Sequence, residues 1–145
     1  MVLRLEAVRE RLLQLEEVVS NLESTGPLDA DGLRRDFRNR WTVERGLQLG
    51  AEVILDTGNH ILSAHFGVTA KDYEDIITQL AARQVIDESL RENLKGIGGF
   101  RNVLVHGYLR IDPDRVAEHL AKAPAHFSEF ARQIRAWTEK IVGTP

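Results

Sequence analysis

The segment Phe100–Arg110 brings four chemically active side chains into an otherwise apolar stretch. Arg101, Asn102, His106 and Tyr108 supply a guanidinium, a carboxamide, an imidazole and a phenol. A neutral imidazole can take up a proton near neutral pH. A guanidinium can bind a phosphate group through two hydrogen bonds and offset the negative charge that grows on it. The set therefore fits chemistry at a phosphate.

These residue types indicate cleavage of RNA by its own 2′-hydroxyl, a reaction for which we expect neither a metal ion nor a cofactor. His106 is the predicted general acid and base, because its imidazole can remove the proton of the 2′-hydroxyl. Arg101 is predicted to stabilise the pentacovalent phosphate. Asn102 would orient either group, and Tyr108 would donate a hydrogen bond or stack on a base. The expected products carry a 2′,3′-cyclic phosphate and a free 5′-hydroxyl.

A structural interpretation of the same residues stays open. Arg101 would then form a surface ion pair, His106 would hydrogen-bond at an interface, and Tyr108 would only pack. The Arg-x4-His spacing alone arises often by chance in a chain this rich in arginine. Adding the asparagine after the arginine and the tyrosine two residues after the histidine makes the pattern much rarer.

An ideal helix through this segment separates the two predicted catalytic residues. Its core side should hold Phe100, Val103, Leu104 and Gly107, while Val105 and Leu109 should point away from the core. Arg101 and His106 would lie about 140° and about 7.5 Å apart, too far for a tight pair. The helix could end or bend near its glycine, or two copies could meet across a two-fold axis and bury the outward apolar residues. We expect the second arrangement, a homodimer.

The remaining sequence predicts the helices that would hold this segment. Apolar residues recur at steps of three and four from Leu5 to Leu22, which indicates an amphipathic helix that ends at 24–27. An N-cap composition at 29–31 opens a long helix that runs to Gly67. Its core face is predicted to hold Leu33, Phe37, Trp41, Leu47, Ala51, Leu55, Gly58 and Leu62. A second set on the opposite side, Arg45, Leu49, Val53, Asp56 and His60, indicates a central helix or a subunit interface.

Further start signals divide the second half of the chain. Thr69 opens a capping box, Asp87 can cap a short helix over 88–95, and Asp112 precedes a proline at the first helical position. We expect Pro124 to interrupt the helix that follows, before a last helix ends near Ile141. No segment alternates as a strand would. The predicted fold is an all-α, up-and-down bundle of about five helices in one domain, residues 1–145.

Several other polar groups are weaker candidates. Asp56 and His60 stand four residues apart and would form a local hydrogen-bonded pair or line a cleft with Arg45. No metal-ligand spacing includes the histidines at 60 and 65. The glycines at 96–99 have the composition of a phosphate nest, but a helix N-terminal turn fits better because no strand precedes them. We assign no role to His119 and His126.

Composition limits the classes of protein that fit. The chain has 145 residues, 43% of them hydrophobic, a net charge of −3 and no cysteine. The acidic net charge argues against a general nucleic-acid coat protein. Residues 91–110 nevertheless hold four basic residues against one acidic, and residues 31–50 hold five against three. We expect no signal peptide, no membrane span and a cytoplasmic location.

The motif resembles one known family. Residues 101–108 match the Arg-x4-His-x-Tyr signature of the HepT toxins in the HEPN superfamily, and the likeness covers roughly residues 30–120. This resemblance implies a homodimeric helical bundle with the motif in a cleft at the dimer interface, and a metal-independent endoribonuclease with Arg101 and His106 as catalytic residues. It also implies a cognate minimal nucleotidyltransferase antitoxin that assembles with the toxin and transfers AMP to Tyr108.

Two other functions fit the same cleft. One is a non-catalytic HEPN interaction module that binds a nucleotidyltransferase partner or a nucleotide. The other is a chain that serves only as a substrate or scaffold for AMP transfer. Release of cyclic-phosphate ends from RNA in the presence of EDTA would distinguish the enzyme from both.

Overall fold

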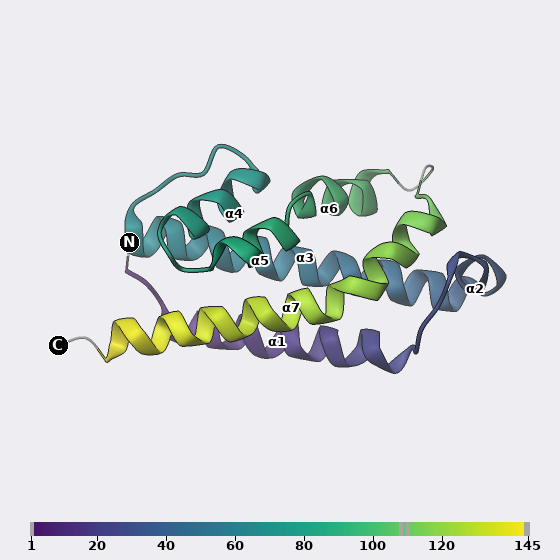
Figure 1. Cartoon of the computed structure of the whole chain (residues 1–145), viewed down its shortest axis with the longest axis horizontal. Coiled ribbons are helices and arrows are strands. Elements are labelled where there is room, and N and C mark those ends of the chain that lie inside the picture. Colours follow the sequence, from purple (N-terminus) through teal and green to yellow (C-terminus); the bar gives the residue numbers. More distant parts are fainter. Residues whose placement is uncertain (1, 108, 110, 144–145) are drawn as a thin grey trace.

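A computed structural model of the chain describes residues 2–107, 109 and 111–143. The described residues form seven helices and no strand (Figure 1). These are α1 (Leu5–Ser24), α2 (Ala30–Arg35), α3 (Phe37–Phe66), α4 (Tyr73–Ala82), α5 (Glu88–Asn93), α6 (Ile97–His106) and α7 (Pro113–Val142). The predicted all-α bundle is confirmed. Five of the helices have ten or more residues, whereas α2 and α5 have six each.

The helices form two layers around one hydrophobic core. The long helices α1, α3 and α7 pack against one another, with α1 running opposite to the other two (Figure 1). Helices α4 and α6 pack on α3, on the side away from α1. Fully buried leucines, isoleucines and Phe130 fill the interior of the bundle. Burial of each such side chain contributes about 1.5–3 kcal/mol. The motif helix α6 therefore rests on α3, one of the two longest helices of the bundle.

The prediction of one long helix from residues 29–31 to Gly67 is wrong at its N-terminal end, where the structure has two helices, α2 and α3. Asp36 is extended, with φ −133° and ψ 111°, and its carboxylate accepts the backbone N–H of Arg38 at 2.9 Å. The chain therefore ends α2 and starts a new helix, α3, one residue later. Phe37 and Trp41, which we predicted in the core, are 50% and 61% exposed. The hydrogen bond from the N–H of Arg38 to Asp36 replaces a bond of a continuous helix, so the helix breaks at Asp36. Because the backbone changes direction there, the helical spacing that placed Phe37 and Trp41 in the core no longer applies.

The capping predictions had mixed outcomes. Asp87 and Asp112 cap α5 and α7 as predicted, through the backbone N–H groups of Leu90 and Asp114. The box predicted at Thr69 lies three residues later. Asp72 is the N-cap of α4, and its carboxylate accepts the N–H of Asp75 at 2.8 Å.

Pro124 does not divide the last helix. Helix α7 is continuous over 30 residues and contains this proline in its interior. Because proline has no N–H, one intrahelical hydrogen bond is missing there, and such sites bend helices. Figure 1 shows that the first part of α7 leans toward α6 before the helix turns to run along α1. This part of α7 comes near enough to α6 for the side chains of His119 and Phe100 to touch.

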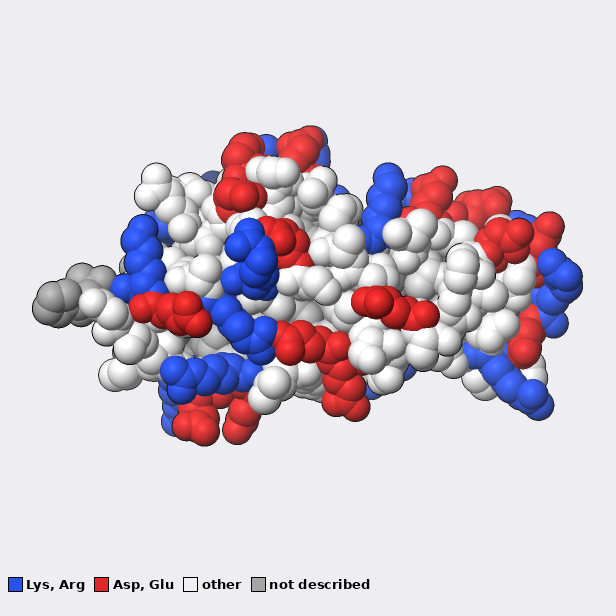
Figure 2. Space-filling view, turned by 60° about the horizontal axis from the view of Figure 1, so that its bottom comes forward, with Lys and Arg blue, Asp and Glu red and all other residues white. Residues whose placement is uncertain are grey.

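The charges on the surface are mixed. On the face shown in Figure 2, basic and acidic residues alternate rather than gather in a patch of one sign. None of the described helices is both long and apolar enough to cross a membrane.

Candidate active site

Helix α6 is anchored at its beginning by a carboxylate from another helix. Its N-cap, Gly96, has φ +87° and no side chain that could cap the helix. Glu74 of α4 takes that role, since its two carboxylate oxygens accept the N–H groups of Gly96 at 3.0 Å and Gly98 at 2.9 Å. A negative charge is favourable at a helix N-terminus. The prediction that the glycines form a helix N-terminal turn is confirmed, and Glu74 occupies the position of an external anion.

The same end of α6 lies very close to α4. A Cβ atom added to Gly98 would lie 2.5 Å from the Cβ of Tyr73, which is shorter than van der Waals contact allows. Glycine at this position therefore lets the two helices approach. The approach brings the ring of Tyr73 next to the first residue of the motif.

The faces of α6 differ in part from the prediction. Phe100 and Leu104 are buried as expected, but Val103 is 43% exposed. Val105, predicted to point outward, is half-buried. This residue projects on the flank where α4 packs, about 40° from Arg101 on the helical wheel. Leu109 is 85% exposed, as predicted.

Arg101 is held by three neighbours. Its Nη2 lies 3.4 Å from Oε1 of Glu52 on α3, and its Nη1 donates to Oδ1 of Asn102 at 3.2 Å. Its Cζ lies 5.4 Å from the centre of the Tyr73 ring, a cation–π distance. The guanidinium carries five N–H donors and uses only a few of them in these contacts. The side chain is thus fixed in position and can still bind a phosphate.

His106 is the last residue of α6 and is exposed. The N–H of Gly107 makes the last helical bond, to the carbonyl of Val103 at 2.8 Å, and the helix stops there because the backbone of Gly107 leaves the helical region, with φ −96° and ψ 28°. The helix thus ends at Gly107, the first of the two arrangements that the sequence left open. Within the described part of the chain, no side chain forms a hydrogen bond with the imidazole. Tyr108, the predicted supporting and modified residue, lies outside the described residues.

Asn102 and Asp56 share a pocket. Both line a cavity of ≈ 410 Å³, together with Tyr73 and residues of α3 and α4. Asn102 is exposed and its carboxamide accepts a bond from Arg101, so it lies between the guanidinium and this cavity. Asp56 therefore remains a candidate for the lining of a cleft beside the motif.

His60 and Arg45 lie elsewhere on α3. The Nε2 of His60 accepts the backbone N–H of Arg4 at 3.2 Å, and burial, helped by Arg11 and Arg4, lowers the pKa of this imidazole. The described residues show no hydrogen bond between His60 and Asp56. Arg45 is exposed, and no ion pair among the described residues includes it. The structure does not bring these two side chains together with Arg101.

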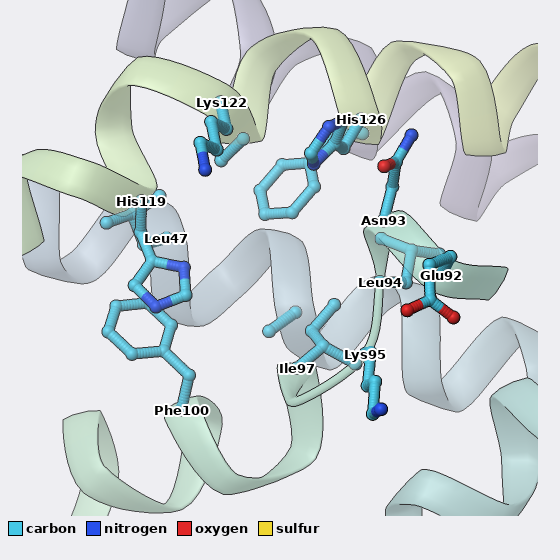
Figure 3. Close-up of a pocket in the computed structure, with 13 residues that line it drawn as sticks. Leu47, Glu92, Asn93, Leu94, Lys95, Ile97, Phe100, His119, Lys122 and His126 are labelled. Atoms are coloured by element: carbon cyan, nitrogen blue, oxygen red, sulfur yellow. The ribbon is translucent and has the colours of Figure 1, made fainter. Parts of the chain in front are cut away.

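Two histidines to which we assigned no role lie beside the motif helix. His119 stacks on the ring of Phe100, with the ring centres 3.6 Å apart and the planes at 17°. His119 and His126 both line a second cavity, which is drawn in Figure 3 and also includes Phe100. Their spacing with Lys122, at i, i+3 and i+7, places all three on one face of α7 and was the signal that sequence reasoning missed. Among the described residues, no three His, Asp or Glu side chains form a cluster that could hold a metal ion.

Comparison with known sequences gives consistent matches. The family described as Ribonuclease HepT-like matches residues 10–134. The tRNA nuclease HepT of Aphanizomenon flos-aquae is 28% identical over 131 residues, which cover 90% of this chain and 88% of that protein. The mRNA nuclease HepT of Shewanella oneidensis is 30% identical over 108 residues, which cover 74% of this chain and 81% of that protein.

Solved structures share the fold. The cytosolic protein YutE from Bacillus subtilis superposes with a TM-score of 0.84 at 24% identity, covering 100% of this chain and 98% of that one. A tri-AMPylated Shewanella oneidensis HEPN toxin in complex with an MNT antitoxin superposes with a TM-score of 0.78 at 25% identity. That match covers 89% of this chain and 96% of the toxin.

Proposed function

Because the chain belongs to the HepT-like ribonuclease family, we propose that it is a metal-independent endoribonuclease toxin in which His106 and Arg101 cleave RNA. Family membership confirms the predicted kinship with the HepT proteins and the prediction of a ribonuclease. The proposed step is attack of a 2′-hydroxyl oxygen on the adjacent phosphorus. The P–O5′ bond breaks, which leaves a 2′,3′-cyclic phosphate on one product and a 5′-hydroxyl on the other.

The observation that carries this proposal is the contrast between the two side chains on α6. Arg101 is already fixed by Glu52, Asn102 and Tyr73, so it can receive a phosphate without first losing side-chain freedom. His106 is exposed at the end of the helix and forms no hydrogen bond with another described side chain, so its imidazole is accessible to a substrate hydroxyl. A positioned cation and a free base are the two groups that the reaction needs.

A dimer would complete the site. The 2′ and 5′ oxygens lie on opposite sides of phosphorus in an in-line displacement, so one imidazole cannot serve both. Two copies of His106 related by a two-fold axis can, with one removing the proton of the 2′-hydroxyl and the other protonating the departing 5′ oxygen. The outward face of α6 supports such an approach. It holds Gly99, Asn102 and Val103, all exposed, and a Cβ added to this glycine would meet nothing within 4 Å.

We also assign the chain a partner. Its relative from Shewanella oneidensis is a tri-AMPylated toxin in complex with an MNT antitoxin. We propose that a minimal nucleotidyltransferase binds this chain too, in the cytoplasm, and transfers AMP from ATP to the phenolic oxygen of Tyr108, with release of pyrophosphate and of the phenol proton. Tyr108 is two residues from His106 in the sequence, so the added nucleotide and its negatively charged phosphate would repel an approaching RNA backbone. Residues 1–145 would act as one domain in both the free dimer and the complex.

The decisive experiment measures RNA ends. Purified protein is incubated with total RNA in excess EDTA, and the products are tested for 2′,3′-cyclic phosphates. We expect cleavage by the wild-type protein and its loss in His106→Ala and in Arg101→Ala. His65→Ala, which removes an exposed imidazole at the far end of α3, serves as the matched control and should cleave normally. Full activity in a folded His106→Ala protein would overturn the catalytic assignment. No cleavage by any form, with the nucleotidyltransferase still bound, would favour the interaction module.

A further inference from the structure

A second cavity lies beside α6, on the side where His119 of α7 contacts Phe100. It has a volume of ≈ 270 Å³ and is enclosed by residues of α3, the end of α5, α6 and α7 (Figure 3). Its floor is apolar and includes Leu47, Ile97 and Phe127. Its rim is polar, with residues of the α5–α6 connection on one side and of α7 on the other. No step of the proposed cleavage uses this cavity.

An aromatic platform stands at one end of the cavity. Figure 3 shows the imidazole of His119 lying over the ring of Phe100, and the ring centres are 3.6 Å apart. His126 faces the same space from the next turns of α7. Burial is the largest cause that lowers the pKa of both imidazoles, and Lys122 adds to it. A neutral imidazole offers one donor and one acceptor, the combination that the edge of a nucleobase requires.

The charged groups on the rim are mainly positive. Lys122 extends from α7 toward the cavity in Figure 3, and Lys95 lies on the opposite rim. Glu92 is the acidic residue of the lining, and its carboxylate is paired with Arg91 at 3.0 Å. Among the described residues, no carboxylate forms an ion pair with either lysine. A ligand phosphate would therefore find a cation that is not already neutralised.

We propose that this cavity binds one nucleoside monophosphate, with the base on the apolar and imidazole side and the phosphate at Lys122. The volume of ≈ 270 Å³ is close to the lower limit of ordinary ligand pockets, which suits a single nucleotide rather than a longer ligand. The stack between Phe100 and His119 presents an aromatic surface, and bases stack on such surfaces with little dependence on sequence.

The ligand has two sources, which share this chemistry. It is a free nucleotide or one nucleotide of an RNA strand that also passes the motif. Phe100 immediately precedes Arg101 on α6 and lies about 9 Å along the helix axis from His106. Phe100 and His106 also lie about 120° apart around the helix, so a strand that reaches both sites would have to pass around the side of α6. The proposal concerns binding and does not depend on cleavage.

The test is a titration of the His106→Ala protein, which keeps RNA intact under the proposed function. AMP, UMP and inorganic phosphate are added separately, and backbone amide shifts are followed by NMR together with calorimetry. A short RNA is titrated in a parallel arm. Lys122→Glu and His119→Ala are the site variants. Lys140→Glu, five turns along the same helix, makes the same charge change as the lysine variant and serves as control.

We expect AMP or UMP to shift the amides around His119 and Lys95, and Lys122→Glu to weaken binding at least tenfold while Lys140→Glu leaves it unchanged. Binding of the mononucleotides identifies the free nucleotide as a ligand. An RNA that binds at least tenfold more weakly to Lys122→Glu, with no mononucleotide binding, identifies the RNA strand as the source. The proposal is overturned if neither ligand shifts these amides, or if the two site variants, Lys122→Glu and His119→Ala, bind as the parent does. Cleavage by the protein with an intact His106 is unaffected by that failure, so the two proposals can fail separately.

Discussion

The two ends of helix α6 are held very differently. At the N-terminal end, Glu74 caps the helix from α4 and Gly98 lies against Tyr73, and one turn later Arg101 joins the same group of contacts. At the C-terminal end, α6 stops at His106, which is exposed and forms no hydrogen bond with another described side chain. One helix thus carries a fixed cation and a free imidazole.

The difference indicates which part of the site this chain completes alone. Fixing the guanidinium in advance lowers the entropy lost when a phosphate binds. Leaving the imidazole open allows a second copy or the substrate to supply its orienting partner. The ion pair between Arg101 and Glu52 agrees with the purely structural interpretation for that residue. The structural interpretation has no such support at His106, because no described side chain forms a hydrogen bond with its imidazole.

Removing the cap of α6 should have the largest effect on stability. In Glu74→Ala, the N–H groups of Gly96 and Gly98 lose their acceptor, and we expect a loss of about 2 kcal/mol in the free energy of unfolding. Cleavage should fall as well, because α6 carries both proposed catalytic residues. Urea unfolding and cleavage rates measure the two effects.

The control for this change is Glu118→Ala, an exposed glutamate on α7. It should leave both stability and cleavage unchanged. If Glu74→Ala were as stable as the parent, the anchored end of α6 would not depend on its cap, and the contrast between the two ends would lose its main support.

The two proposed catalytic residues should differ in what they contribute to folding. Arg101→Ala removes the contacts with Glu52 and the Tyr73 ring, and we expect a loss of about 1 kcal/mol. His106→Ala should leave the free energy of unfolding within about 0.5 kcal/mol of the parent, because surface substitutions without specific contacts have small effects. Both should abolish cleavage.

Thermal unfolding of the two variants at matched concentration makes this comparison. A large destabilisation in His106→Ala would mean that the imidazole is already engaged within the protein, for example across a dimer interface. Equal stability of both variants would contradict the description of Arg101 as a fixed side chain.

Local signals predicted much of the fold, and long-range contacts account for most of what they missed. Asp87 and Asp112 were recognisable as caps because each bonds to a backbone N–H two or three residues ahead. The cap from Glu74 joins residues 22 and 24 positions apart, and no local pattern reveals it. The break at Asp36 was missed because the apolar spacing continues through it. There the decisive feature is one side-chain bond to the N–H of Arg38.

In the candidate site, too, local patterns were predictable and long-range contacts were not. The placement of Arg101 and His106 on one helix followed from helical geometry, whereas the end at Gly107 was only one of two arrangements that the sequence left open. Apart from the adjacent Asn102, the neighbours of Arg101 come from α3 and α4, so their identity required the packing of three helices. The stack of His119 on Phe100 depends on the first part of α7 leaning toward α6, and an isolated helical wheel of α7 gives no sign of it.

His119 of α7, which stacks on Phe100 at the buried flank of α6, should make stability depend slightly on pH. Burial lowers the pKa of His119 below its usual 6.5, and Arg115 and Lys122 add to this while Glu118 opposes it. The unfolded chain therefore binds a proton at this residue more readily than the folded protein does. Stability should fall as the pH drops below about 6.5, because protons then favour the unfolded state.

Urea midpoints between pH 5 and 8 measure this effect. They should decline less steeply with falling pH in His119→Gln than in the parent, and His60 and His126 should account for part of the decline that remains. Parallel declines in the two proteins would mean that burial does not hinder protonation of His119, and the description of this side of α6 as a buried flank would not hold.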